Sequence, residues 1–147
     1  MFVRGAVLGM LVLALATACG GDGGGESEEE RAAEEAAAGQ TCPEAPAAMT
    51  GQPQLPAGFP TPEGVTYTSE REAGPSRIVE GYREGDIEEA FEAYKDAFPD
   101  AGYEVTKDER EEVDAEVNFE GGSSTGQVKL IQECSDRTSV AITIRPE

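Results

Sequence analysis

The stretch Asp86-Ile87-Glu88-Glu89-Ala90-Phe91-Glu92-Ala93-Tyr94-Lys95-Asp96-Ala97-Phe98 carries the strongest structural signal in the chain. Its four large apolar side chains recur at spacings of four, three and four residues, so they share one face of a helix. Asp86 is a favourable N-cap, and Pro99 followed by Gly102 indicates where the helix ends. The sequence therefore predicts a helix over residues 87–98 that packs on a core through Ile87, Phe91, Tyr94 and Phe98.

Short segments on both sides of this helix show the period-two alternation of β-strands. Each segment has one apolar face, which favours an antiparallel sheet with one buried face, and the helix supplies the matching apolar stripe. The sequence thus predicts an α+β fold: a single, mostly antiparallel sheet of about six strands with one amphipathic helix on one face, in the order β-β-α-β-β-β-β. The expected strands are residues 65–69, 77–82, 103–107, 113–119, 128–134 and 138–144.

The remaining segments divide the chain into three parts. Residues 1–18 contain one early positive charge and then an apolar run, which is typical of a signal peptide and shorter than the roughly 20 residues of a spanning helix. Residues 19–54 are rich in Gly, Glu and Pro and predict a flexible acidic tether, with only a transient helix at 26–38. Residues 55–147 form the predicted α+β domain.

The sequence Leu15-Ala16-Thr17-Ala18-Cys19-Gly20 closes the apolar run. It resembles the lipobox of bacterial lipoproteins, with the leucine one place further from the cysteine than in the family pattern. The resemblance implies that Cys19 becomes the first residue of the mature protein. It also implies that Cys19 carries a lipid that anchors the protein at the extracytoplasmic face of the cell membrane. The alternative is ordinary secretory cleavage, which would leave Cys19 an incidental thiol.

Two further features extend this resemblance along the chain. A Phe-Pro-x-Pro-x-Gly segment runs from Phe59 to Gly64, and the predicted helix leads to Ala101-Gly102-Tyr103. Together with the lipobox and the polar tether, they make the chain similar to small exported lipoproteins of high-GC Gram-positive bacteria. The resemblance implies an envelope protein and no catalytic residues.

The chain contains three cysteines, an odd number for an exported protein. If Cys19 is lipidated, Cys42 and Cys134 remain, and export favours a disulfide between them. Such a bridge closes a loop of about 90 residues, which is worth on the order of 4 kcal/mol in the chain-entropy model. The alternative is a pair of free thiols.

The composition excludes several function classes. A formal net charge of −19 repels nucleic acid and anionic lipid headgroups. The chain has no histidine, which rules out Ser-His-Asp and Cys-His catalysis and any His-containing zinc site. Residues 121–127 have the glycine spacing of a phosphate loop, but Gln127 stands where lysine is required and a strand follows, so we expect a hairpin loop. No cofactor or metal is predicted.

Acidic side chains gather on the sheet face that points away from the predicted helix. If residues 103–107 and 113–119 form a hairpin with regular alternation, its outward side is rich in carboxylates. Like charges on neighbouring strands repel, and a divalent cation or a basic partner would relieve that repulsion. The alternative is a solvated face of an acidic protein. The predicted acidic contact face consists of Glu104, Asp108, Asp114, Glu116 and Glu120.

These observations favour a non-enzymatic binding or accessory module, held at the membrane by lipid on Cys19. Its expected partner is an envelope protein or a basic or cationic ligand that meets the acidic contact face. One alternative is a small carboxylate-dependent enzyme acting on cell-envelope material. It requires two carboxylates to converge in a cleft. A cation-binding or purely structural spacer domain is a further alternative. The carboxylates that the enzyme would use are Glu104, Asp108, Asp114 and Glu116.

Overall fold

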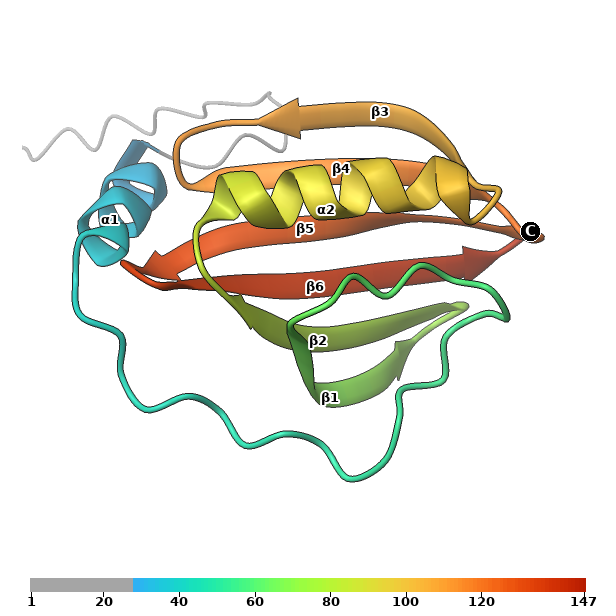
Figure 1. Ribbon diagram of the computed structural model, residues 1–147, viewed down its shortest axis with the longest axis horizontal. Coiled ribbons are helices and arrows are strands. Elements are labelled where there is room, and N and C mark those ends of the chain that lie inside the picture. Colours follow the sequence, from blue (N-terminus) through green and yellow to red (C-terminus); the bar gives the residue numbers. More distant parts are fainter. Residues whose placement is uncertain (1–27) are drawn as a thin grey trace, which may run out of the picture.

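The computed structural model describes residues 28–147 and shows one antiparallel sheet with a long helix lying across it (Figure 1). The strands lie in the order β1-β2-β6-β5-β4-β3, so β5 and β6 are central and β1 and β3 are the edges. The elements are α1 (Glu28–Ala38), β1 (Val65–Ala73), β2 (Ser76–Glu84), α2 (Ile87–Asp100), β3 (Glu104–Arg110), β4 (Asp114–Gly121), β5 (Ser124–Cys134) and β6 (Arg137–Pro146).

The predicted class is confirmed, because the chain forms a single six-stranded antiparallel sheet of the α+β type. The predicted order is matched in part, since the helix α1 precedes the first strand. In place of a transient helix in a tether, α1 is a helix of 11 residues that lies against β5. An ion pair of 2.6 Å between Arg31 Nη1 and Glu111 Oε2 joins it to the turn after β3.

The helix α2 begins where the sequence predicts and ends two residues later, at Asp100. The Asp86 carboxylate accepts a hydrogen bond of 2.8 Å from the amide of Glu89. The amide of Ile87 donates to the side chain of Gln132 at 2.7 Å, which attaches the start of α2 to β5. Pro99 is accommodated in the last helical turn, and the amide of Ala101 closes the helix on the carbonyl of Ala97.

Aromatic rings fill the core between α2 and the sheet. Phe98 of α2 is stacked on Phe119 of β4, with ring centroids 4.6 Å apart. Phe59, which precedes the first strand, places its ring edge-on to Phe119 at 5.3 Å and to Phe98 at 5.6 Å. A segment outside the regular elements therefore closes one side of the core, which is why residues 55–64 fold with the domain.

We call the sheet face that packs on α2 the inner face and the opposite one the outer face. We also distinguish two ends of the sheet (Figure 1). The near end holds α1, the start of α2 and the β5–β6 turn. The distal end holds the β1–β2 turn at Gly74-Pro75, the β4–β5 turn at Gly122-Ser123 and the last residues of β6. The β4–β5 turn is shorter than predicted, because β5 already begins at Ser124.

Candidate functional site

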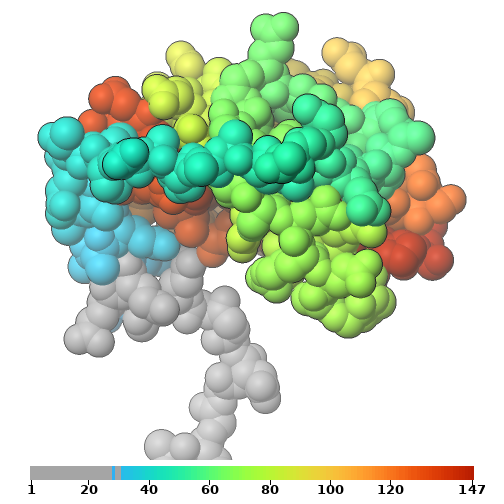
Figure 2. Space-filling view, turned by 90° about the horizontal axis from the view of Figure 1, so that it is seen from below, coloured from blue at the N-terminus to red at the C-terminus, as the bar shows by residue number. Residues whose placement is uncertain are grey.

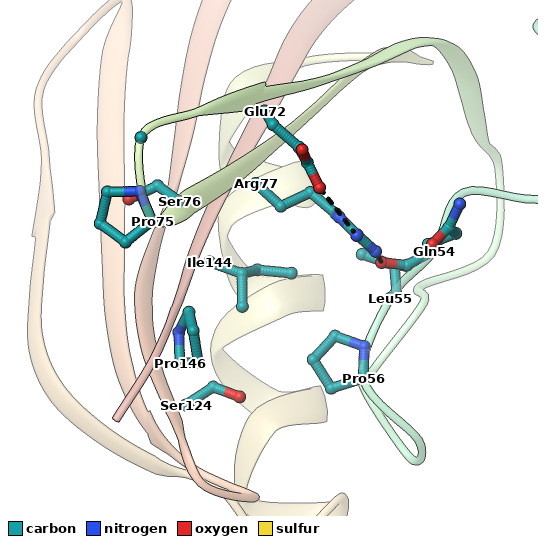
Figure 3. A pocket seen from close by; sticks show the side chains of 11 residues that line it. Gln54, Leu55, Pro56, Glu72, Pro75, Ser76, Arg77, Ser124, Ile144 and Pro146 are labelled. Carbon is teal, nitrogen blue, oxygen red and sulfur yellow. Dashed lines mark hydrogen bonds and ion pairs between the residues drawn. The ribbon is translucent and has the colours of Figure 1, made fainter.

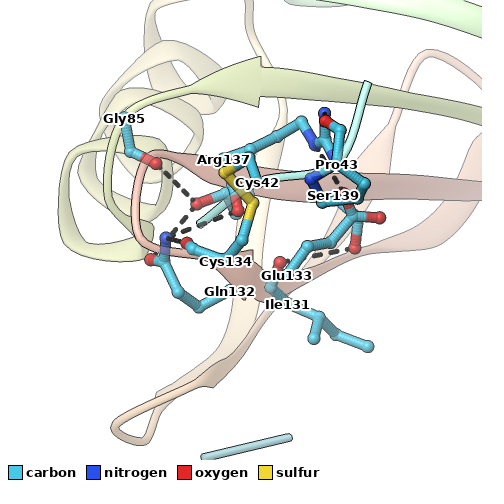
Figure 4. A network of polar contacts seen from close by, with 10 residues as sticks. Cys42, Pro43, Gly85, Ile131, Gln132, Glu133, Cys134, Arg137 and Ser139 are labelled. Atoms are coloured by element: carbon cyan, nitrogen blue, oxygen red, sulfur yellow. Dashed lines mark hydrogen bonds and ion pairs between the residues drawn. A yellow bond between two sulfur atoms is a disulfide. The ribbon is translucent and has the colours of Figure 1, made fainter. Parts of the chain in front are cut away.

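A disulfide joins Cys42 to Cys134 at the near end of the sheet, which confirms the predicted pairing (Figure 4). Residues next to the disulfide also form hydrogen bonds to the segment that contains Cys42. The amide of Ser135 donates to the carbonyl of Gln40 at 2.9 Å. The guanidinium of Arg137 donates to the Pro43 carbonyl at 3.0 Å. Covalent and hydrogen bonds therefore fasten residues 40–43 to the β5–β6 turn.

Residues 39–54, which we call the strap, continue from this disulfide along the β1 edge of the sheet. Figure 2 shows the strap, in teal, crossing one side of the molecule from α1, in blue. The amide of Met49 donates to the carbonyl of Tyr67 in β1 at 2.8 Å, and the amide of Gln54 donates to the Glu70 carboxylate at 2.8 Å. The predicted flexible tether is thus wrong for residues 28–54, because α1 and the strap are bonded to the domain.

The lipobox-like stretch and Cys19 lie outside the described residues, so the predicted lipid anchor stays a prediction. Within residues 28–147, neither helix is long and apolar enough to cross a membrane.

The predicted acidic contact face is wrong for Asp108. The pairing of β3 with β4 is irregular between Val105 and Lys107, so the residues that follow are shifted by one position. Asp108 therefore lies opposite Val117, on the inner face. Its carboxylate lies 3.0 Å from the ammonium of Lys95 on α2, and this hydrogen bond raises the pKa of Lys95.

The same shift brings a lysine onto the outer face. Lys107 lies opposite Asn118 and forms an ion pair of 2.7 Å with Glu109, which raises the pKa of Lys107 and lowers that of Glu109. Asp114 is 3.2 Å from the ammonium of Lys129 on β5. Lys129 therefore neutralises one member of the acidic contact face, Asp114, and Lys107 adds a positive charge to the same face.

The carboxylates required by the enzyme alternative do not all converge. Asp108 lies on the inner face, whereas Glu104 pairs with Glu120 at the opposite end of β4 from Asp114. Six strand residues correspond to about 20 Å, which is too far for two groups to act on one bond. Within the described chain, no group of three or more His, Cys, Asp or Glu side chains is placed to hold a metal ion.

A pocket with one apolar wall opens at the distal end of the sheet, on the inner side (Figure 3). Its volume is about 410 Å³. The Arg77 guanidinium at its rim donates to the Gln54 carbonyl at 2.7 Å and lies 3.6 Å from the Glu72 carboxylate, so its charge is balanced. We call this the distal pocket. Its apolar wall is formed by Leu55, Pro56, Pro75, Ile144 and Pro146.

Sequence reasoning missed the distal pocket. It forms where the end of the strap, the β1–β2 turn and the end of β6 meet, and these segments are far apart in the sequence. The high proline density of residues 43–62 was a signal that this segment is extended, but nothing local indicates what it lies against.

A second, polar cavity lies on the outer face at the same end, with a volume of about 280 Å³. We call it the outer hollow. Its polar side chains are Thr106, Asn118, Glu120, Thr125, Thr143 and Arg145. Of the predicted acidic contact face, only Glu120 lines this cavity.

No family model, curated protein or solved structure matches the chain.

Proposed function

We propose that the protein is a lipid-anchored binding or accessory module on the extracytoplasmic face of a bacterial cell membrane, without catalysis of its own. The observation that carries the proposal is the disulfide. The chain has three cysteines, and the bond between Cys42 and Cys134 leaves Cys19, in the lipobox-like stretch, as the third. A structural disulfide is also typical of an exported protein.

The position of α1 supports a defined orientation at the membrane. Eight residues, 20–27, lie between Cys19 and Glu28, so these two residues are at most about 30 Å apart. A lipid on Cys19 therefore holds α1 and the near end of the sheet close to the membrane. The distal pocket and the outer hollow open at the other end, where a partner can reach them.

The charge of the protein supports the same arrangement. The whole chain has a net charge of −19, so the protein is repelled by anionic headgroups and the lipid, rather than the surface of the domain, provides the attraction to the membrane. Ligand sites in proteins are concavities that combine apolar walls with a few polar groups, and the distal pocket has an apolar wall together with the polar side chains of Gln54, Glu72 and Arg77.

Replacing Cys19 tests the anchor. We expect Cys19→Ser to move the protein from the membrane fraction of the native host into the soluble or secreted fraction, measured by fractionation and immunoblotting. The double variant Cys42→Ser/Cys134→Ser is the matched control, because it also replaces cysteines by serine but keeps the predicted site of lipidation.

The control should remain with the membrane. Continued membrane association of Cys19→Ser would contradict the proposal. So would an unmodified Cys19 in the wild-type protein, determined by mass spectrometry of its N-terminal peptide.

A further inference from the structure

The outer hollow is lined by an arginine, Arg145, whose charge is not balanced by a neighbouring carboxylate of the described chain. Among the Lys and Arg side chains of residues 28–147, Arg145 is the only one without an ion pair. Acidic residues outnumber basic ones by 30 to 11, so an unpaired guanidinium is unexpected. Arg145 is exposed and lines the hollow, where its N–H groups can hold a carboxylate in a bidentate manner.

The other side of the outer hollow carries an unbalanced negative charge. Glu120 lines the hollow, and Glu104 lies directly opposite it on β3. Neither carboxylate forms an ion pair within the part of the chain that the structure describes. Two like charges in directly opposed positions destabilise a sheet, and an ammonium group placed between them would relieve that repulsion.

The register shows how these charges are spaced. Glu120 lies opposite Thr125 on β5, and Thr125 lies opposite Arg145 on β6. The backbones of Glu120 and Arg145 are therefore two strands apart, or about 10 Å. The lining between them consists of uncharged hydrogen-bonding side chains, which are Asn118, Thr125 and Thr143.

We propose that the outer hollow binds a short peptide with a free ammonium group and a free carboxylate. The peptide carboxylate pairs with Arg145, its ammonium lies beside Glu120 and Glu104, and its amides contact the threonine and asparagine side chains. Three extended residues span about 10 Å, which matches the spacing of the two charged sides. A simple anion would not reduce the repulsion between the two carboxylates. A simple cation would not pair with Arg145.

Titration calorimetry with triglycine tests this inference on the purified full chain. We expect saturable binding that Arg145→Gln and Glu120→Gln each weaken at least about tenfold. Arg71→Gln is the matched control, because it also removes one exposed arginine but from β1, outside the hollow. It should leave the affinity within about twofold.

Two blocked peptides separate the zwitterion from simpler ligands. N-acetyl-triglycine lacks the ammonium and triglycinamide lacks the carboxylate, so we expect neither to bind measurably. Absence of triglycine binding at millimolar concentration would overturn the inference. Equal binding of a blocked peptide, or an equal loss in Arg71→Gln, would overturn it as well. These measurements do not involve the membrane, so their failure is distinguishable from failure of the anchor proposed on Cys19.

Discussion

Tyr94 places a phenolic hydroxyl inside the core. Its side chain is 0% exposed, and its hydroxyl lies near the hydroxyl of Tyr67. Burial raises the pKa of Tyr94 well above its usual value, and the neighbouring Tyr67 hydroxyl adds to the effect. The folded protein therefore keeps Tyr94 neutral at a pH where the unfolded chain ionises it.

This difference predicts a loss of stability at alkaline pH. The folded pKa is raised, so the contribution of Tyr94 is fully present below the unfolded pKa of 10.0 and declines as the pH rises above it. We expect Tyr94→Phe to lose less stability than the wild type above pH 10, by up to about 1.4 kcal/mol per pH unit. Urea unfolding at pH 7 and at pH 10–11 measures the difference, and parallel pH profiles would contradict it.

Gly126 in β5 has a packing role that the sequence alone does not reveal. A Cβ on Gly126 would collide with the carbonyl oxygen of Thr143 and lie 2.6 Å from the Phe119 ring. Phe119 thus fills the space that the missing side chain leaves. In the sequence, Gly126 is only one member of a Gly/Ser-rich stretch that predicts a loop. The predicted loop over residues 121–127 was therefore longer than the turn observed. Gly126 belongs to β5 because Phe119 of β4 occupies the place of its side chain, and the local sequence does not show this contact.

At the scale of elements, the alternation in β4 and β6 was predictable, whereas the bulge in β3 was not. Val117 and Phe119 face the core as the period-two pattern predicts. β3 is an exposed edge strand with few apolar residues, so nothing in its sequence shows where its register shifts. One extra residue moves Asp108 to the other face, and the candidate site predicted from alternation was accordingly wrong for that residue.

The apolar stripe of α2 predicts a large effect of truncation. Phe91 is 4% exposed, as its helical spacing indicates. We expect Phe91→Ala to lower the free energy of unfolding by about 3–5 kcal/mol, because it removes a buried ring and leaves a cavity. Glu92→Ala, on the exposed side of the same turn, is the control and should change stability by less than about 0.5 kcal/mol. Similar urea midpoints for all three proteins would contradict this packing.

The edge strands are protected in different ways. β3 carries mixed charges at Glu104, Lys107, Asp108, Glu109 and Arg110, which discourage pairing with another strand. The first residues of β1 are more apolar than those of β3. The strap covers part of the β1 edge through the Met49–Tyr67 hydrogen bond. The strap therefore serves the sheet as a cover, a role that its proline-rich composition does not reveal.

At the scale of the whole molecule, the disulfide predicts a redox-dependent stability. It closes a loop with a sequence separation of 92 residues, which corresponds to about 4–5 kcal/mol in the chain-entropy model. We expect reduction to lower the melting temperature by about 10 °C or more, measured by circular dichroism. The Cys42→Ser/Cys134→Ser variant should melt at the lower temperature with or without reductant. An unchanged melting temperature on reduction would contradict this role.

The organisation of the whole chain was predictable only in outline. The α+β class follows from strand alternation around one amphipathic helix, and the disulfide follows from counting cysteines. The docking of α1 and the strap does not follow, because α1 has no large apolar side chains and the strap is held mainly by backbone carbonyls and amides. Contacts of that kind leave no pattern in the sequence.

The disulfide also determines how the molecule bears mechanical load. A pull on residue 28 passes along α1 to Cys42 and then directly into Cys134 at the end of β5, a central strand. The loop through residues 43–64 is bypassed, so tension does not reach β1 and cannot peel that edge strand from the sheet. Strand β5 has a hydrogen-bonded neighbour on each side, and many of those bonds must resist together. With the disulfide reduced, the same pull would reach β1 first and open the sheet from its weakest side.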